Sequence, residues 1–410
     1  MEEHLQAYFA WRAEGIQNAW CWHVDAHLDI GKTGLGPDRL SALSACADFE
    51  AAESADLLGN SYLPWGGLHC GNYLYPAISE GIVGRLTWVI PPDLPEGPLL
   101  TWAQGHINDW FDLSLSEFAS LKLDGNRVVG TLLGIPFEMG TLESLDLPQE
   151  PVLLDIDIDY FLKEDGSVWQ DSRRFAEAIA PIPRLFTTVA YSVKGGFTPD
   201  WERRLAEPFF PQDRDSSASI GIDEPPYTAT SLDELAALVR CHRYREALQC
   251  SAGDSQIEVL FLRGTALQAL ERIEEALDLW QALLENPAVQ GDARAYLHGL
   301  CSEILCQLKR PSEALEHSLK GQKLDPLDYR HHWAEAVSLE ALGQIRKATK
   351  VLRRVVKLSE HHLFGLKARY ALVRLYQAQK KDGLAKMELR QLAQLDVTGQ
   401  FRPVTLLHGV

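Results

Sequence analysis

Two short stretches of the chain place ionisable side chains at every second position among apolar residues. WHVDAHLDI, residues 22–30, carries His23, Asp25, His27 and Asp29, and PVLLDIDIDYF, residues 151–161, carries Asp155, Asp157 and Asp159. Alternate side chains of a strand share a face, so each stretch brings its charged groups together. Buried carboxylates without cations cost several kcal/mol each, and carboxylates mixed with imidazoles suit Mn, Fe or Zn ions. The pattern therefore predicts a metal site.

The alternative for the second stretch is an exposed or arginine-paired edge strand. Its apolar positions argue against exposure: Leu153, Leu154, Ile156, Ile158 and Phe161. One DxHxD motif is a weak signal, but a DxHxD and a distant DxD that both end apolar strands are a much stronger one. In parallel sheets, sites form beyond the carboxyl ends of the strands, and we expect the two stretches to meet there.

The motif DAHLD, residues 25–29, followed much later by a DxD strand, resembles the arginase and agmatinase class of ureohydrolases and, more widely, the arginase/deacetylase fold. EEHLQA near the start and HCGNYLYPAI, residues 69–78, resemble an arginase-like branch that includes enzymes converting peptidyl arginine to ornithine. The resemblance spans about residues 1–205. It implies two Mn²⁺ ions per subunit, with a shared hydroxide that attacks the guanidinium carbon and releases urea.

The resemblance also implies a ligand set. Asp25 and one aspartate of the DxD motif would bridge the two ions, His4 and Asp29 would complete one site, and His27 with the last aspartate would complete the other. DIDID contains two overlapping DxD pairs. We favour Asp157 and Asp159 because they lie nearer the carboxyl end of the strand. Asp155 and His23 would then support the ligands from behind, with His23 otherwise a core histidine.

Substrate contacts and proton transfer also follow from the resemblance. The loop histidine His69 is the candidate proton shuttle. Asp29, already a predicted metal ligand, is predicted to be catalytic as well. Asn72 would orient this loop or the substrate. Each of these two loop residues has an alternative role: His69 could simply bond the backbone of its loop, and Asn72 could be a turn residue. Arginases pair the guanidinium with an acid late in the fold, where this chain has TTVAYSVKGGF, residues 187–197. Three residues remain as candidates for that contact: Ser192, Glu202 and Glu224.

The front half of the chain has the pattern of an α/β fold. Four apolar runs read as strands: AWCWHVDAHLDI, RLTWVIPPD, PVLLDIDIDYF and RLFTTVAYSV. HLQAYFAWRAEG and WQDSRRFAEAIA read as helices between them. Nearly continuous apolar strands that alternate with helices indicate a mainly parallel sheet covered on both faces. We therefore predict a three-layer α-β-α, arginase-like domain over residues 1–212.

From about residue 230 the chain reads as an all-α repeat. An alanine recurs in a similar setting at Ala247, Ala276, Ala314, Ala348 and Ala385, with separations of 29, 38, 34 and 37 residues. Small residues stand twelve positions earlier in three copies: Gly264, Ser302 and Ala336. The period resembles tetratricopeptide (TPR) repeats, which stack helical hairpins into a solenoid. We predict a linker over 213–231 and a TPR-like domain over 232–400. A plain helical cap on the front domain is the alternative.

Composition narrows the choice of partner and compartment. Of the net charge of −18, residues 1–230 contribute −21 and residues 231–410 contribute +3. Nucleic acid is a poor partner for so acidic a front half, whereas metal ions or a cationic substrate suit it. The chain has no apolar run long enough for a membrane span and no signal-peptide pattern. Seven scattered cysteines without a CxxC pair are typical of a cytoplasmic protein with reduced thiols.

Together these patterns predict a manganese-dependent peptide arginase. Its substrate would be an arginine-containing peptide, such as a ribosomally made precursor, held partly by the repeats. Two alternatives remain open. One is another C–N hydrolase on the same scaffold, such as a deacetylase, an amidase or a small-guanidine ureohydrolase. The other is a non-enzymatic TPR scaffold, which would not explain the acids on apolar strands. The oligomeric state stays open.

Overall fold

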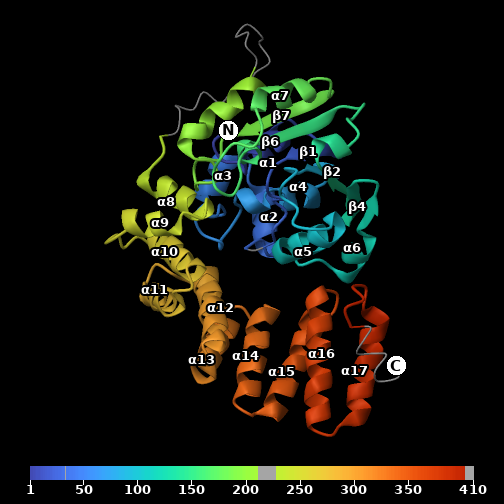
Figure 1. Cartoon of the computed structure of the whole chain (residues 1–410), viewed down its shortest axis with the longest axis vertical. Helices are drawn as coiled ribbons and strands as arrows, with labels where there is room; N and C mark the ends of the chain where they lie inside the picture. Colours follow the sequence, from blue (N-terminus) through green and yellow to red (C-terminus); the bar gives the residue numbers. More distant parts are fainter. Residues whose placement is uncertain (33, 211–227, 402–410) are drawn as a thin grey trace. The chain divides into compact units, whose positions relative to one another are not determined.

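The computed structural model describes residues 1–32, 34–210 and 228–401 (Figure 1). The chain forms two compact units, Met1–Phe111 with Leu121–Arg272, and Asp112–Ser120 with Ile273–Val410. Most of the predicted linker and the candidate residue Glu224 lie outside the described residues. The first unit extends beyond the boundary predicted near residue 231, because three helices of the expected repeat domain pack within it.

A seven-stranded sheet, in the order β3-β4-β5-β2-β1-β6-β7, forms the core of the first unit. The strands are β1 (Ala19–Val24), β2 (Val83–Val89), β3 (Lys122–Asp124), β4 (Arg127–Leu132), β5 (Ile135–Gly140), β6 (Val152–Asp157) and β7 (Arg184–Ala190). Five strands run parallel, from β5 to β7, and β3 and β4 add an antiparallel edge. The predicted α/β fold with a mainly parallel sheet is confirmed.

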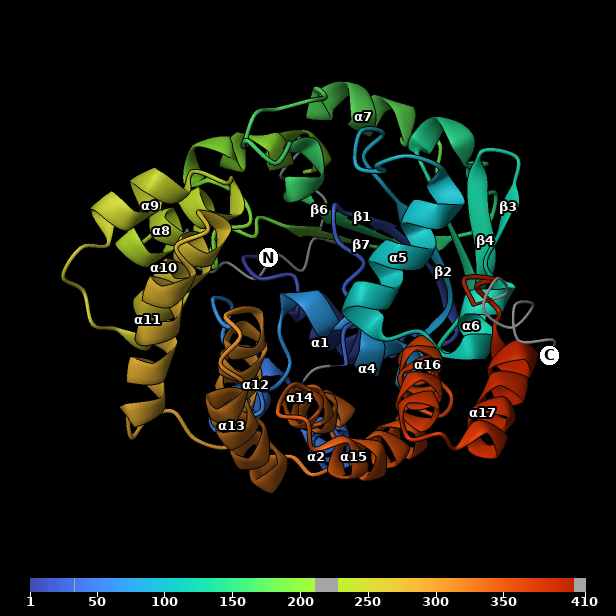
Figure 2. The same ribbon diagram turned by 60° about the horizontal axis from the view of Figure 1, so that its bottom comes forward.

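Helices cover both faces of this sheet (Figure 2). On one face, α7 (Ser172–Ala178) and the 3₁₀ segment η4 (Asp200–Phe209) pack on Trp22 and Ile156. On the other face lie α1 (Gln6–Ala13) and α4 (Leu74–Ser79). The other elements of this unit before residue 231 are α2 (Pro37–Ala45), α3 (Phe49–Ser54), η1 (Cys70–Asn72), α5 (Leu99–Phe111), η2 (Leu142–Ser144) and η3 (Ile158–Phe161).

Three further helices are anchored to the loops of the first unit: α8 (Ser231–Arg240), α9 (Tyr244–Cys250) and α10 (Ile257–Ala269). The Asp233 carboxylate of α8 accepts a hydrogen bond from the Tyr62 hydroxyl (2.6 Å) and another from the Gly195 backbone N–H (3.0 Å). Gly196, at φ +72°, lies so close to α8 that a Cβ would overlap the backbone of Ala237. The sequence assigned these helices to the repeats; these contacts explain why they pack with the first unit instead.

The second unit is helical. It contains α6 (Leu115–Ser120), α11 (Ile273–Glu285), α12 (Gly291–Gln307), α13 (Pro311–Leu324), α14 (Tyr329–Ala341), α15 (Ile345–Leu358), α16 (Leu363–Ala378) and α17 (Asp382–Leu395). From α11 onward each helix packs against the next in chain order. The recurring alanines are buried, and the Ser302 hydroxyl donates to the Ala314 carbonyl (2.9 Å) where α12 meets α13. The predicted run of stacked helices is confirmed here.

The segment Asp112–Ser120 joins the second unit although it lies far away in sequence. The Tyr329 hydroxyl donates to the Asp112 carboxylate (2.8 Å), and the Leu115 N–H donates to the His361 carbonyl (2.7 Å). His362 also bonds the Asp112 carbonyl through Nδ1 (2.9 Å). These contacts place the short helix α6 against the loop between α15 and α16.

All seven cysteines are free, since none lies in a disulfide. Within residues 1–32, 34–210 and 228–401, no helix combines the length and the apolar character that crossing a bilayer would need.

Candidate metal centre

Charged side chains gather at the carboxyl ends of β1 and β6. The two strands are parallel neighbours, with His23 opposite Asp155. Trp22 and Ile156 point into the core beneath α7, so the alternate residues point toward α1 and α4. The charged groups at the strand ends or just after them lie on the same side of the sheet: Asp25, His27, Asp29, Asp157 and Asp159. The structure therefore brings the two acidic stretches together.

Backbone pairing of the N-terminal segment positions His4 in this cluster. The Tyr191 N–H donates to the Met1 carbonyl and the Ser192 N–H donates to the Glu2 carbonyl, both at 3.0 Å. This pairing lies directly beyond the end of β7, and His4 follows two residues later with no exposed surface. The approach of His4 thus depends on backbone pairing with the segment after β7.

His4, Asp25 and Asp29 form the first ligand group. His4 Nδ1 lies 3.2 Å from Asp25 Oδ2, 3.5 Å from Asp29 Oδ2 and 3.2 Å from Asp157 Oδ2. None of these oxygens is in hydrogen-bonding geometry with it, and both His4 Nδ1 and Asp25 Oδ2 are buried without a hydrogen-bond partner. Two ligand atoms bound at right angles to one Mn²⁺-sized ion lie about 3 Å apart. The spacing of these atoms fits a shared cation.

Asp25, His27 and Asp159 form the second ligand group. His27 Nδ1 lies 3.0 Å from Asp159 Oδ2 and 3.5 Å from Asp25 Oδ1. Asp25 belongs to both groups, since its Oδ2 faces His4 and its Oδ1 faces His27. A carboxylate that presents different oxygens to two groups can bridge two ions. The side chain of His27 is 45% exposed, so the second group lies on the accessible side of the cluster.

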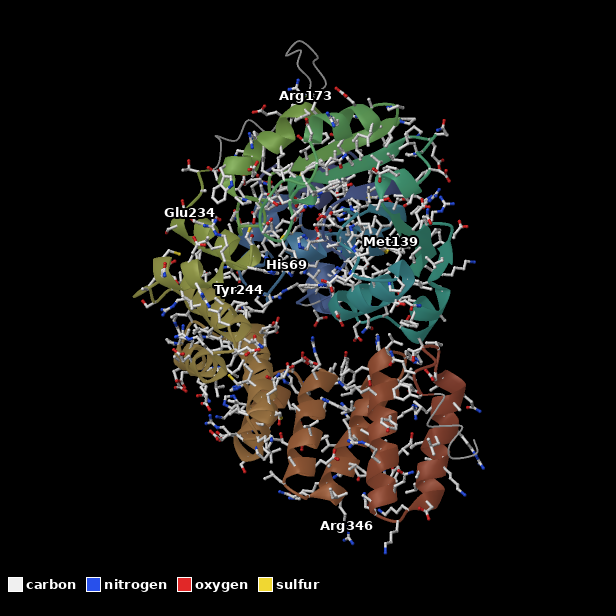
Figure 3. All side chains as sticks on the ribbon, in the orientation of Figure 1. His69, Met139, Arg173, Glu234, Tyr244 and Arg346 are labelled. Atoms are coloured by element: carbon white, nitrogen blue, oxygen red, sulfur yellow. The ribbon has the colours of Figure 1, made fainter. Side chains whose placement is uncertain are left out.

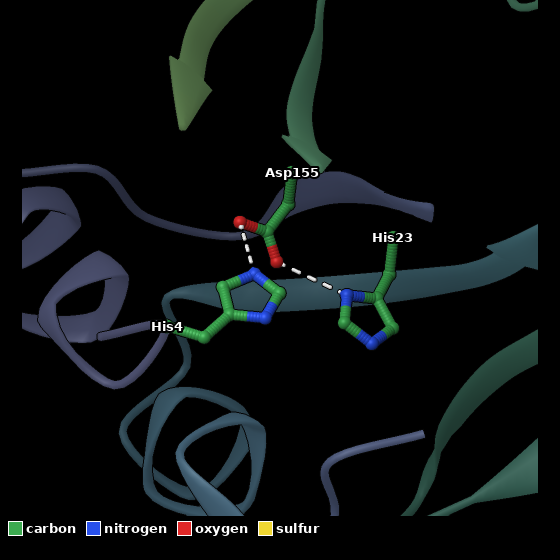
Figure 4. Close-up of side chains that lie close together, drawn as sticks. All are labelled: His4, His23 and Asp155. Carbon is green, nitrogen blue, oxygen red and sulfur yellow. Dashed lines mark hydrogen bonds and ion pairs between the residues drawn. The ribbon is translucent and has the colours of Figure 1, made fainter. Parts of the chain in front are cut away.

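Asp155 lies behind the first group with both oxygens occupied (Figure 4). Its Oδ1 is 3.0 Å from His4 Nε2 and accepts from the Thr188 hydroxyl. Its Oδ2 accepts from the Tyr73 hydroxyl (2.5 Å) and is 3.1 Å from His23 Nδ1. Although His4, His23 and Asp155 lie close enough to hold an ion themselves, these contacts leave Asp155 little free acceptor capacity. A proton on His4 Nε2, shared with Asp155, leaves the Nδ1 lone pair for the first group.

The pKa values in the cluster show a deficit of positive charge. Burial lowers the pKa of His4, but the adjacent Asp155 carboxylate raises it well above its usual value. Burial and then the charge of Asp25 raise the pKa of Asp29 to about 6. Burial also raises the pKa of Asp159, and neighbouring carboxylates add to that shift. Despite burial, the neighbouring histidines hold the pKa values of Asp25 and Asp155 below their usual range, so Asp29 and Asp159 are the acids that a cation would stabilise most.

Replacing Tyr73 by phenylalanine is expected to weaken Mn²⁺ binding by about 10- to 100-fold without unfolding the protein. The hydroxyl donates to Asp155 and lies 2.9 Å from His4 Nε2, so its loss frees the group that orients His4. Competition titration against a fluorescent chelator measures the change. Tyr75→Phe is the matched control, because Tyr75 lies in the first turn of α4, which Tyr73 precedes, and among the described residues its hydroxyl makes no hydrogen bond to the cluster. Equal affinities for the two variants would contradict the orienting role.

His69 lies on the loop that leads into α4, within the first unit (Figure 3). Its Nδ1 accepts from the Gly71 N–H (3.1 Å), so a neutral ring carries its proton on Nε2. Burial and then the charge of Arg240 lower the pKa of His69 to about 4. The loop reaches the cluster where the Leu74 N–H donates to the Asp29 carbonyl (3.1 Å). The role of His69 as a proton shuttle stays a prediction.

The predicted substrate residues have other contacts. Asn72 accepts from the His69 N–H (2.8 Å) and donates to the Gly67 carbonyl (3.1 Å), so its amide holds the loop. The Ser192 hydroxyl donates to Asp157 Oδ2 (2.5 Å), the same oxygen that lies 3.2 Å from His4 Nδ1. Glu202 pairs with Arg204 (3.3 Å) and, in the part of the chain that the structure describes, makes no ion pair with the cluster. These contacts give the three residues structural roles, and their predicted substrate contacts stay a prediction.

Four residues that shape the site were not predicted: Glu3, Tyr73, Thr188 and Arg240. Glu3 accepts from the Ser61 hydroxyl (2.6 Å) and pairs with Lys194 (2.9 Å), which ties the N-terminal segment to two loops. Tyr73 stands within HCGNYLYPAI, so the resemblance offered a signal for it. Glu3 stands within EEHLQA, which carries the same resemblance, whereas Thr188 and Arg240 carry no motif, because their roles arise only when distant segments meet.

Comparison with known proteins leaves the family of the chain open. No family model matches it, and no curated protein matches it. MamA (41-end) from Desulfovibrio magneticus RS-1 aligns at 17% identity over 42% of this chain and 99% of that chain, with a TM-score of 0.37. MamA MSR-1 aligns at 16% identity over 40% and 94%, with a TM-score of 0.35. YrrB, described as a TPR protein with an unusual peptide-binding site, aligns at 19% identity over 44% and 84%, with a TM-score of 0.33.

Proposed function

We propose that this protein is a hydrolase with two divalent metal ions that cleaves the guanidinium C–N bond of arginine in a peptide, giving ornithine and urea. The observation that supports the metal centre best is His4 Nδ1, which is buried, has no hydrogen-bond partner and lies within 3.5 Å of three aspartate oxygens. Acceptor atoms that converge in a protein interior need a cation. The substrate class rests on the resemblance of DAHLD and the DxD strand to ureohydrolases.

The ligand groups divide naturally between two Mn²⁺ ions. His4, Asp25, Asp29 and Asp157 would hold one ion, and Asp25, His27 and Asp159 would hold the other. When bound, such a pair supplies Lewis acidity and lowers the pKa of a water molecule. Asp155, with Tyr73 and Thr188, keeps His4 oriented so that Nδ1 faces the ion.

His69 is the group on this chain best suited to move a proton to the leaving nitrogen. Its Nδ1 accepts from the Gly71 N–H, so Nε2 carries the proton of the neutral ring, and His69 can take up a second proton only after Nδ1 gives up the Gly71 contact. The neighbouring Asn72 amide holds the loop in place. Proton transfer by this imidazole therefore requires a local movement of the loop that frees Nδ1.

The stacked helices of the second unit support a peptide as substrate. Solenoids of helical hairpins usually present an extended binding surface. A peptide held there would gain effective concentration at the metal centre through the connecting chain. No such surface would be needed for hydrolysis of a small free guanidine.

Mass spectrometry of arginine peptides incubated with the Mn²⁺-loaded protein tests this function. We expect a loss of about 42 Da per modified arginine, the mass of CN₂H₂, together with released urea. Free arginine, assayed alongside, should turn over more slowly. Turnover of free arginine alone would refute the peptide part of the proposal. Two bound ions without loss of mass would refute ureohydrolysis and favour an amidase or deacetylase of the same scaffold.

A further inference from the structure

Arg240, the last residue of α8, has an unusual environment for a cation. Its Nε donates to the Gly195 carbonyl (2.8 Å) and its Nη2 donates to the Ser61 carbonyl (3.2 Å). These two bonds hold the guanidinium in one orientation and leave Nη1 without a hydrogen bond. Within the residues that the structure describes, no carboxylate forms an ion pair with Arg240. A half-buried guanidinium usually has such a partner, because burial of an unpaired charge is costly.

The position of this guanidinium relates it to the metal centre. It lies flat on the ring of Phe197, with Cζ 3.5 Å from the ring centroid. The same ring meets the candidate ligand His27 edge-on, with centroids 5.6 Å apart. One aromatic ring therefore separates Arg240 from the exposed ligand of the second group. Its charge also reaches the loop histidine, since it adds to the burial that lowers the pKa of His69.

Several contacts between α8 and the loop after β7 fix the position of Arg240. Gly196 lets α8 approach closely, and Asp233 at the start of α8 bonds the Gly195 N–H. Gly195 thus binds α8 at both ends, through its N–H to Asp233 and through its carbonyl to Arg240. A helix fixed at both ends presents a preorganised cation beside an acidic cluster. Burial lowers the pKa of Arg240 and the charge of Asp159 raises it, but Asp159 forms no ion pair with the guanidinium, so its N–H groups remain available to an anion that enters with the substrate.

We propose that Arg240 binds a carboxylate of the substrate. The protein would then prefer a peptide in which a carboxylate lies close to the side chain of the arginine that is hydrolysed. This inference rests on the proposed function and narrows its substrate class. A guanidinium can donate two parallel hydrogen bonds to one carboxylate. In Arg240, Nη1 and the second hydrogen of Nη2 can donate these bonds. The carboxylate has two chemical sources: the α-carboxylate of a C-terminal arginine, or an acidic side chain next to an internal arginine.

Four short peptides separate these sources. They are acetyl-Ala-Arg with a free carboxylate, its C-terminal amide, acetyl-Asp-Arg-amide, and acetyl-Asn-Arg-amide as the neutral match of the third. With the Mn²⁺-loaded full chain, we expect at least about tenfold lower KM for one acidic peptide than for its neutral counterpart. Preference for the free carboxylate identifies the first source, and preference for the aspartyl peptide identifies the second. No preference in either pair overturns the proposal.

Arg240→Gln is expected to remove the preference, measured as the ratio of the KM values of the acidic and neutral peptides of a pair, while the protein keeps its bound Mn²⁺. Arg240→Lys should keep part of the preference, because it retains the charge but loses the bidentate contact. Arg243→Gln is the matched control, since Arg243 is exposed and paired with Glu246 (2.6 Å). An equal loss for acidic and neutral peptides in Arg240→Gln would show a purely structural role and overturn the proposal.

Calorimetric binding of the same four peptides keeps this test independent of turnover. If no peptide releases urea, the proposed ureohydrolysis fails, but the acidic and neutral peptides can still be compared by their Kd. An Arg240-dependent difference of about tenfold in Kd would then support the carboxylate subsite alone. Equal Kd values in the presence of two bound ions would refute it.

Discussion

Asp25→Asn is expected to lower kcat/KM for an arginine peptide by at least about 10³ and to remove both metal ions from the protein. Asp25 is the residue that belongs to both ligand groups, with Oδ2 3.2 Å from His4 Nδ1 and Oδ1 3.5 Å from His27 Nδ1. Asparagine keeps the size of the side chain but removes the charge and one acceptor oxygen. Each group then loses a carboxylate ligand at once, so the two ions should be lost together.

Elemental analysis of the dialysed protein and peptide kinetics measure this effect. Asp38→Asn is the matched control, because Asp38 is exposed on α2 and lies in neither ligand group. We expect it to retain two ions and full activity. If Asp25→Asn retained both ions, Asp25 would not be the bridge, and the assignment of the two groups would be wrong. If it lost one ion only, the centre would be two separate sites.

The alternation of the strands made the cluster predictable from sequence. Residues two apart on a strand share a face, which accounts for Asp155 and Asp157 of β6, and the charged groups beyond the two strand ends lie at the same edge because β1 and β6 are parallel neighbours. The recurring alanines likewise indicated helical repeats, because a small residue at a fixed period marks a close helix contact. Both predictions used periodicity, which local sequence determines.

Features that depend on distant segments were not predictable in this way. The pairing of residues 1 and 2 with Tyr191 and Ser192, which places His4, has no local signature. The packing of α8 against Gly195 and Gly196 depends on a match between two surfaces, so the boundary near residue 231 was placed too early. The strands β3, β4 and β5, on one side of the sheet, lacked the continuous apolar runs of the central strands.

Asp29→Asn is expected to raise the melting temperature of the metal-free protein at pH 8 by several degrees and to lower it in the presence of Mn²⁺. Burial and the charge of Asp25 raise the pKa of Asp29 from 3.8 to about 6. Because the folded state holds this proton more tightly than the unfolded state, Asp29 destabilises the fold as pH rises from about 4 to about 6. Above that range the cost is about 3 kcal/mol, which asparagine removes.

The backbone makes this substitution a clean one. Asp29 has φ +54°, and asparagine is among the few residues that adopt such a conformation readily. The variant therefore tests the charge and not the strain. In Mn²⁺ the wild-type protein gains stability by ligand binding, whereas the variant lacks one ligand of the first group and gains less. The order of the two melting temperatures should reverse between EDTA and Mn²⁺.

Calorimetric melts at pH 8 and pH 4 distinguish charge repulsion from packing. At pH 4 the Asp29 carboxyl is largely protonated in the folded state, so the metal-free wild type and variant should melt within about a degree of each other. A variant that is less stable in EDTA at both pH values would mean that Asp29 stabilises the fold by its contacts. The acidic cluster would then be a self-sufficient network of aspartates and protonated histidines, and the need for a cation, on which the proposed function depends, would disappear.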